Sequence, residues 1–393
     1  MEFADELADG AKGAALPLIR HDLGLSYAQL GLLASVPLLA GGALELPLGM
    51  LAGHGRRRRI FVLGGGVVFV LALAGAALAP SFVVLLAAFT VFYPASGAFV
   101  SLTQAGLMDA WPRRQPRVMA RWELAGSAGA VAGPLLLAAV LAAGGGWRAG
   151  YLVLAGLAVA AWLGTWLRGD VPAAGGAGGD GGGDGDGGAG GNAAGAGWAA
   201  RVREALAALQ DPGTARWLVL LQVADLLVDV LTGFLAVYLV DVAHLRPAVA
   251  ALAIAIRLGA GLAGDAALVL VLERVSDLTV LRASAAAATA LYPAFLLVPG
   301  IAAKLVILAA LSAATATWYP LLQARLYRSL PGRSPVAVTL SSAAGFAGGL
   351  GPLAAGLLAE VSGLPTALAF LAAVPPVMLA ACARGTGKDP ADR

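Results

Sequence analysis

Charged residues are scarce in this sequence. Only 12% of its 393 residues are Asp, Glu, Lys or Arg, whereas 59% are hydrophobic, and the mean hydropathy is +0.82. A soluble domain carries about 25% charged residues, so this chain has too few to cover a surface that faces water. The shortage excludes a soluble protein and predicts an outer face in contact with lipid.

Cysteine and histidine are scarce as well. Cys382 is the only cysteine, which excludes a disulfide within the chain, and the three histidines are too far apart in sequence for a zinc-binding pattern. The glycine tract at 178–184 follows no strand and leads to no Gly-Lys-Ser/Thr, so it is not a phosphate-binding loop. We therefore expect no metal, no cofactor and no primary pump in this chain. No nucleophile–base pattern points to an enzyme either.

Long hydrophobic runs fill most of the chain instead. A membrane-spanning helix needs about 20 mostly apolar residues. Such segments occur at 1–19, 27–52, 60–79, 82–107, 118–143, 147–167, 216–240, 247–272, 278–298, 301–328, 335–361 and 364–383. The pattern predicts an all-α polytopic membrane protein with twelve transmembrane helices.

Arginine placement indicates the orientation of these helices. Basic residues gather between the second and third segments at 56–59, between the fourth and fifth at 113–117, and between the tenth and eleventh at 325–333. The connection between the third and fourth segments has none. By the positive-inside rule, both termini are expected in the cytoplasm, in a protein of the plasma membrane.

The middle of the chain has a different character. Residues 169–197 are mostly Gly, Ala and Asp, a composition typical of a flexible linker. Trp198, Val202, Leu206 and Leu209 follow at helical spacing, which indicates a short amphipathic helix on the membrane surface. The chain thus divides into 1–167, 168–215 and 216–393.

The two hydrophobic parts repeat each other. The run from Ala4 to Asp9 matches the run from Ala224 to Asp229 at an offset of 220 residues, with both acids of each run in register. Further pairs at offsets of 218 to 220 are Glu45 with Asp265, Gln104 with Gln323, and Gly133-Pro134 with Gly351-Pro352. Ordered pairs at a nearly constant offset predict two pseudo-symmetric six-helix halves in parallel orientation.

The same offset makes the first segment look short. The seventh segment begins near Arg216, so the first should begin near position −4. We expect the first helix to be truncated at Met1, with further apolar residues before it in the full-length protein.

Two six-helix halves with a long central linker resemble the major facilitator superfamily. The run Gly49-Met50-Leu51-Ala52-Gly53-His54-Gly55-Arg56-Arg57-Arg58 resembles that family's Gly-x-Leu-Ala-Asp-Arg-x-Gly-Arg-Lys loop, with Gly53 in place of the usual Asp. The glycines before Pro134 resemble its antiporter-associated Gly-Pro motif, and Tyr93 stands where the family often has Arg. The resemblance implies roles in gating and helix packing for Gly49, Arg56, Arg57, Gly133, Pro134, Gly351 and Pro352.

Charged residues within the hydrophobic segments are the candidate binding residues. A carboxylate at the centre of a bilayer costs roughly 2.5–3.5 kcal/mol by insertion scales, so it usually faces a partner or a wet cavity. Asp5, Asp9 and Lys12 share one helical face, and Asp225 and Asp229 form the matching stripe. The resemblance places both stripes around a central cavity near the midplane. The full candidate set is Asp5, Asp9, Lys12, Glu45, Asp225, Asp229, Arg257, Asp265, Gln104 and Gln323.

Structural roles remain open for several of these residues. Asp9 could pair with Lys12 on its own helix, and Glu45 or Asp265 could pair with Arg257. Gln104 and Gln323 suit interhelical hydrogen bonds as well as substrate contacts.

These features predict a secondary active transporter that moves a small molecule by alternating access. A buried carboxyl beside a second one binds a proton more readily, so the proton gradient is the expected energy source. Export by proton antiport is our first interpretation, followed by uptake by symport, and then a sensor or assembly protein on a transporter fold. We expect a monomer in the lipid bilayer, with a small-molecule substrate and protons as partners and no nucleic acid.

Overall fold

The structure, a computed structural model, describes residues 1–52, 56–110, 115–168, 203, 207–330 and 334–383. The predicted flexible linker and most of the predicted amphipathic helix lie outside these residues.

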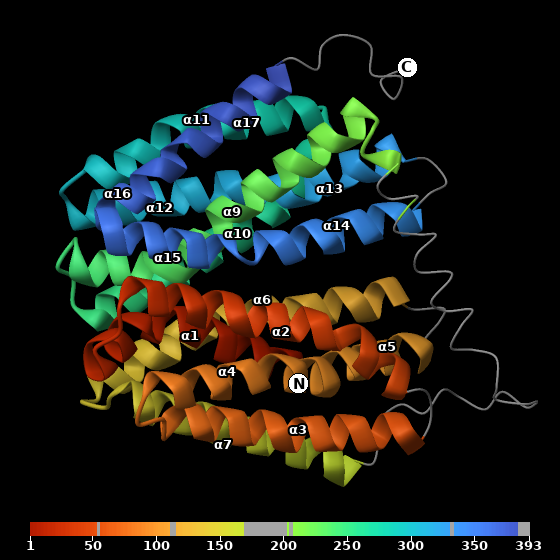
Figure 1. The fold of residues 1–393 in the computed structure, drawn as a ribbon, viewed down its shortest axis with the longest axis vertical. Helices are drawn as coiled ribbons and strands as arrows, with labels where there is room; N and C mark the ends of the chain where they lie inside the picture. Colours follow the sequence, from red (N-terminus) through yellow and green to blue (C-terminus); the bar gives the residue numbers. More distant parts are fainter. Residues whose placement is uncertain (53–55, 111–114, 169–202, 204–206, 331–333, 384–393) are drawn as a thin grey trace, which may run out of the picture.

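Helices make up nearly all of the described chain, in the arrangement of Figure 1. The N-terminal part contains α1 (Glu2–Leu23), α2 (Tyr27–Ala52), α3 (Arg56–Ala77), α4 (Phe82–Ser96), a π-helical turn η1 (Gly97–Ser101), α5 (Leu102–Ala110), α6 (Gln115–Ala142) and α7 (Trp147–Arg168). The C-terminal part contains α9 (Pro212–Asp241), α10 (Pro247–Leu272), α11 (Asp277–Leu297), α12 (Ile301–Ala316), α13 (Trp318–Ser329), α14 (Ser334–Gly348), α15 (Gly351–Ser362), α16 (Leu364–Phe370), a 3-10 turn η2 (Leu371–Ala373) and α17 (Val374–Ala383). In Figure 1, α1 to α7 lie together on one side of the molecule and α9 to α17 on the other.

The all-helical membrane fold predicted from hydropathy is confirmed. Within the described residues, 11 helical spans are long and apolar enough to cross a membrane. Helix α1 is not one of these spans, although it has 22 residues. It carries Asp5, Glu6, Asp9 and Lys12, and it packs against α6, α7, α9 and α10. Its neighbours, rather than its own hydropathy, place α1 inside the bundle.

Four predicted spans are divided into shorter helices within the described residues, and two of them show the effect of proline or glycine. The segment predicted at 82–107 contains Pro94 and continues through the π-helical turn η1 before α5. The segment predicted at 335–361 is interrupted after Gly348, and Pro352 lies in the first turn of α15. Proline is tolerated there because the first turn of a helix has no internal acceptor for its missing N–H group.

Glycine allows α1 and α6 to touch through their backbones. A Cβ on Gly133 would lie 2.3 Å from the carbonyl oxygen of Leu7, and one on Gly129 would lie 2.4 Å from that of Phe3. Small residues that permit such close approach are the usual basis of helix association in membranes. The packing role that the resemblance implies for Gly133 therefore has a direct geometric reason.

Gly133→Ala should destabilise the protein by about 1–3 kcal/mol, because the new methyl group forces the α1 and α6 backbones apart. Thermal unfolding in detergent micelles measures the effect. Gly156→Ala on α7 is the matched control, since a Cβ there meets nothing within 4 Å. Equal unfolding temperatures for the two variants would contradict the packing argument.

Candidate functional site

A polar cavity of about 360 Å³ lies where α1, α2, α4, α9 and α15 meet. Asp5, Asp9 and Lys12 reach it from one face of α1, because residues three and four apart lie above one another on a helix. Asp229 reaches it from α9. The structure thus brings candidates from both repeats into one space, which we call the central cavity.

Lys12 is held in the central cavity by an ion pair and a hydroxyl group. Its Nζ lies 3.1 Å from Oδ1 of Asp9 and donates a hydrogen bond to the Tyr93 hydroxyl. The same hydroxyl donates to Asp9 Oδ1 at 3.0 Å, and Nζ lies 4.5 Å from the centre of the Tyr93 ring. The pairing of Asp9 with Lys12 on one helix, left open by the sequence, is present.

The other acids of the central cavity are less well neutralised. Its lining includes Asp5, Glu6, Asp9 and Asp229 against the single ammonium of Lys12. Oδ1 of Asp5 is buried and has no hydrogen-bond partner among the described residues. The cavity therefore carries an excess of acidic groups.

A second cavity of about 240 Å³ lies between α6, α9, α10 and α12, and we call it the lateral cavity. Arg257 and Asp265, both from α10, line it. Arg257 donates from Nη2 to Thr232 Oγ1 at 2.9 Å and, more weakly, to the Val228 carbonyl at 3.4 Å. Asp265 is exposed and forms no ion pair with Arg257, contrary to one of the alternatives that the sequence left open. Asp225 is partly buried on α9 and lines neither cavity.

Apart from Pro352, the remaining candidates lie away from both cavities or outside the described side chains. Gln104 donates to Met119 Sδ at 3.4 Å, and Gln323 accepts from Ser341 Oγ at 3.4 Å, so each links neighbouring helices. Arg57 is exposed at the start of α3, and Pro352 lines the central cavity. Pro134 lies inside α6, and Gly351 begins α15. The side chains of Glu45 and Arg56, and the surroundings of Gly49, lie outside the described part.

Sequence reasoning did not include Tyr93 or Ser96 among the candidates, yet both line the central cavity from α4. Tyr93 had been noted only as a departure from the family pattern. Gly41 of α2 makes room for it, since a Cβ at that position would lie 2.9 Å from Tyr93 Cβ. The signal that would have found Tyr93 is its place in the segment, where the family often has a polar side chain.

Comparison with known families decides the classification, because a model of the Major Facilitator Superfamily matches residues 3–334. This chain belongs to the Major Facilitator Superfamily. It therefore carries a transporter fold, as the resemblance implied, and not the fold of an enzyme. No curated protein matches the sequence.

Solved structures of superfamily transporters share the whole fold. A bacterial homologue of the human lysosomal transporter Spinster, in an inward-facing and occupied conformation, superposes with a TM-score of 0.77 at 13% identity, covering 100% of this chain and 96% of that one. The nucleoside transporter NupG superposes with a TM-score of 0.77 at 12% identity, covering 99% and 98%. At these identities the likeness establishes the fold alone.

In this superfamily member, polar contacts join the two helix groups at one end of the molecule. Arg20 Nη1 lies 2.5 Å from Asp241 Oδ2, and His21 Nε2 lies 3.0 Å from Asp241 Oδ1. The backbone N–H of Tyr27 donates to Glu360 Oε2 at 2.8 Å. Beside them α2 and α15 almost touch, since a Cβ on Gly356 would lie 2.4 Å from the Tyr27 carbonyl oxygen. We call this set of contacts the closed seam.

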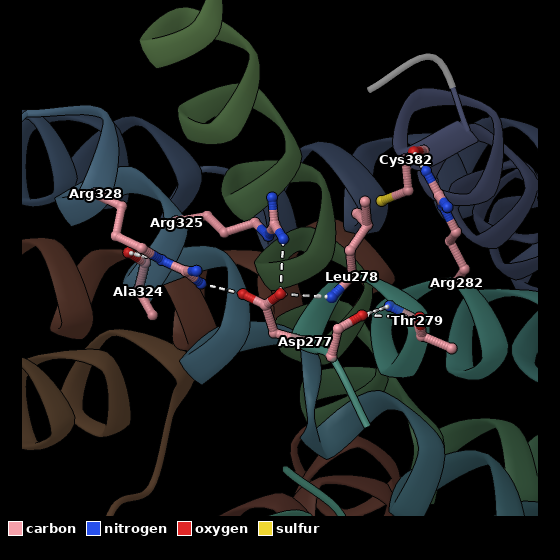
Figure 2. A network of polar contacts seen from close by, with 9 residues as sticks. Asp277, Leu278, Thr279, Arg282, Ala324, Arg325, Arg328 and Cys382 are labelled. Carbon is pink, nitrogen blue, oxygen red and sulfur yellow. Dashed lines mark hydrogen bonds and ion pairs between the residues drawn. The ribbon is translucent and has the colours of Figure 1, made fainter. Parts of the chain in front are cut away.

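A separate polar network lies within the C-terminal helix group, at the start of α11 (Figure 2). Asp277 accepts from Arg325 Nη2 at 2.7 Å and also pairs with Arg328 of α13. Arg282 donates from Nη2 to the Cys382 carbonyl at 2.9 Å. These contacts tie α11 to α13 and α17, so they brace the helix group and do not line either cavity.

Asp9→Asn should destabilise the protein, because Lys12 loses its counter-charge. The loss should be about 1–3 kcal/mol, less than in a dry interior, because the Asp9 side chain is 42% exposed along the cavity. Thermal unfolding in detergent measures it. The double variant Asp9→Asn with Lys12→Met should recover part of the loss, and Asp265→Asn should change little. An Asp9→Asn protein as stable as the wild type would show that the pair adds nothing.

Proposed function

We propose that this protein is a secondary active transporter that moves a small molecule across the plasma membrane by alternating access. The observation that carries the proposal is the central cavity, which lies where α1 of one helix group meets α9 and α15 of the other. A site between two groups of helices becomes accessible from either side when the groups rock against each other. Membership of the superfamily supports the same conclusion.

In this proposal the two helix groups are the pseudo-symmetric halves, and α1 is the twelfth transmembrane helix. The closed seam joins the halves near the end of α1, whereas Arg57 marks the opposite end of the bundle. With arginine-rich connections in the cytoplasm, the seam lies on the outer side and the cavity opens inward. Both termini are then cytoplasmic, and the protein works as a monomer.

Asp229 is the best candidate for the proton-carrying group. It lines the central cavity and, unlike Asp9, forms no ion pair within 4 Å among the described residues. Asp225 lies one turn away on the same helix, so a second carboxyl group stands near the first. We propose export by proton antiport, supported by the excess of acids in the cavity and by the Gly-Pro motif at Gly133. Uptake by symport is the alternative.

Asp229→Asn should abolish solute-driven proton movement, because an amide side chain cannot bind and release a proton near neutral pH. The purified protein is reconstituted into vesicles that contain a pH-sensitive dye. A library of small organic solutes is first applied to wild-type vesicles to find a solute that drives proton movement. Glu273→Gln at the exposed end of α10 is the matched control and should behave as the wild type. Proton movement at the wild-type rate in both Asp225→Asn and Asp229→Asn would remove these residues as the coupling site.

The proposed orientation is open to a labelling test. Cysteines at Gly55 and Gly183, on a Cys382→Ala background, should resist an impermeant thiol reagent in intact cells and react after lysis. A cysteine at Gly146, in the turn between α6 and α7, should react in intact cells, because that turn lies at the outer end. The reverse pattern would overturn the orientation.

A further inference from the structure

The lateral cavity contains a buried cation that the proposed transport cycle does not yet use. Arg257 is 9% exposed and lies on the cavity wall. Arginine is rarely buried in a membrane helix without a partner for its charge or a functional reason. The question is therefore what balances this guanidinium group.

The contacts of Arg257 are neutral and incomplete. Its two hydrogen bonds go to a threonine hydroxyl and a backbone carbonyl, and both come from Nη2. No described carboxylate lies within 4 Å, and Asp229 acts on Arg257 only through its electric field. Nε and Nη1 have no described hydrogen-bond partner, and neither of them is fully enclosed. The N–H donors of a guanidinium group bind a carboxylate or a similar oxyanion strongly.

The rest of the lateral cavity is largely apolar. Its walls include Val131, Leu231, Leu258, Leu262 and Leu311. Ser312 and Thr315 also line it, but their hydroxyl groups already donate to the carbonyls of Leu308 and Leu311. Ser127 and the exposed Asp265 complete the polar lining. Arg257 is therefore the one cationic anchor within the described lining, in a space of about 240 Å³ whose walls are otherwise mostly apolar.

We infer that the lateral cavity binds an organic monoanion, whose charged group pairs with Arg257 and whose apolar part lies against the α6 and α12 side of the cavity. This assignment names a substrate class and rests on the proposed transport function. Thr232 connects the two sites, because it lines the central cavity and accepts from Arg257. Val228 and Asp229 are successive residues of α9, and they line the lateral and the central cavity respectively. The anion thus binds beside the carboxyl group proposed to carry the proton.

The test compares three probes of the same size and different charge: phenylacetate, 2-phenylethanol and 2-phenylethylamine. Purified protein in detergent is titrated with each probe, and thermal unfolding and intrinsic fluorescence are followed. Phenylacetate should stabilise the wild type, and the alcohol and the amine should not. Arg257→Gln should weaken phenylacetate binding roughly tenfold to a hundredfold, and Arg257→Lys should retain part of it.

A second pair of variants keeps the test valid if Arg257→Gln fails to fold. A Cβ on Gly261 meets nothing within 4 Å, and Gly261 lines the lateral cavity, so Gly261→Leu should fill the cavity and block phenylacetate binding. Gly259→Leu is the matched control, since Gly259 has equally open surroundings but is not part of the lining. Binding of the amine in preference to phenylacetate, no binding of phenylacetate to the wild type, or unchanged binding in Gly261→Leu would each overturn the assignment.

Flux measurements separate this inference from the proposed function. Phenylacetate binding that depends on Arg257, in vesicles that move no solute under any gradient, would contradict transport and leave the anion site standing. Gradient-driven movement of other solutes by a protein that does not bind phenylacetate would overturn the anion site alone.

Discussion

Hydrocarbon cannot solvate an ionised side chain, and this constraint governs where each charged residue of the protein lies. Helix α1 depends on it most, because Asp5, Glu6, Asp9 and Lys12 occur within its first half. Such a helix is stable in a membrane only if other helices separate its polar face from lipid. The packing of α6, α7, α9 and α10 around it meets that need, and α2, α4, α9 and α15 complete the wall of the central cavity.

Three of the cations inside the helix bundle satisfy the constraint in three ways. Lys12 is paired with Asp9 and Tyr93. Lys304 donates to the Phe295 carbonyl at 2.5 Å and lies near the Tyr238 and Phe295 rings, so the end of α11 satisfies it. Arg257 has only neutral hydrogen-bond partners, and both are bound through Nη2. The contrast makes Arg257 the cation whose charge is best explained by a ligand.

Backbone contact is the second constraint on this fold. In lipid, helices associate mainly through close packing and hydrogen bonds, because apolar side chains gain little by leaving lipid for protein. Gly133 provides such contact between α1 and α6 within one helix group, and Gly356 provides it between α2 and α15 across the closed seam. Smooth glycine surfaces also leave no side chains to interlock. Together with the few polar contacts of Asp241 and Glu360, they make up the closed seam.

The sequence by itself determined the membrane-spanning helical fold, since hydropathy is a local property of each segment. The helical period also placed Asp5, Asp9 and Lys12 on one face of α1, and the repeat marked Asp229 as their counterpart. Only the tertiary structure decided which of these groups meet. It placed the Tyr93 hydroxyl against the Lys12–Asp9 ion pair, brought Asp265 and Arg257 into one cavity without an ion pair, and directed Gln104 and Gln323 to neighbouring helices. Those outcomes depend on how helices far apart in sequence rotate against one another, and close packing of small residues sets that rotation, which no periodicity within a single helix encodes.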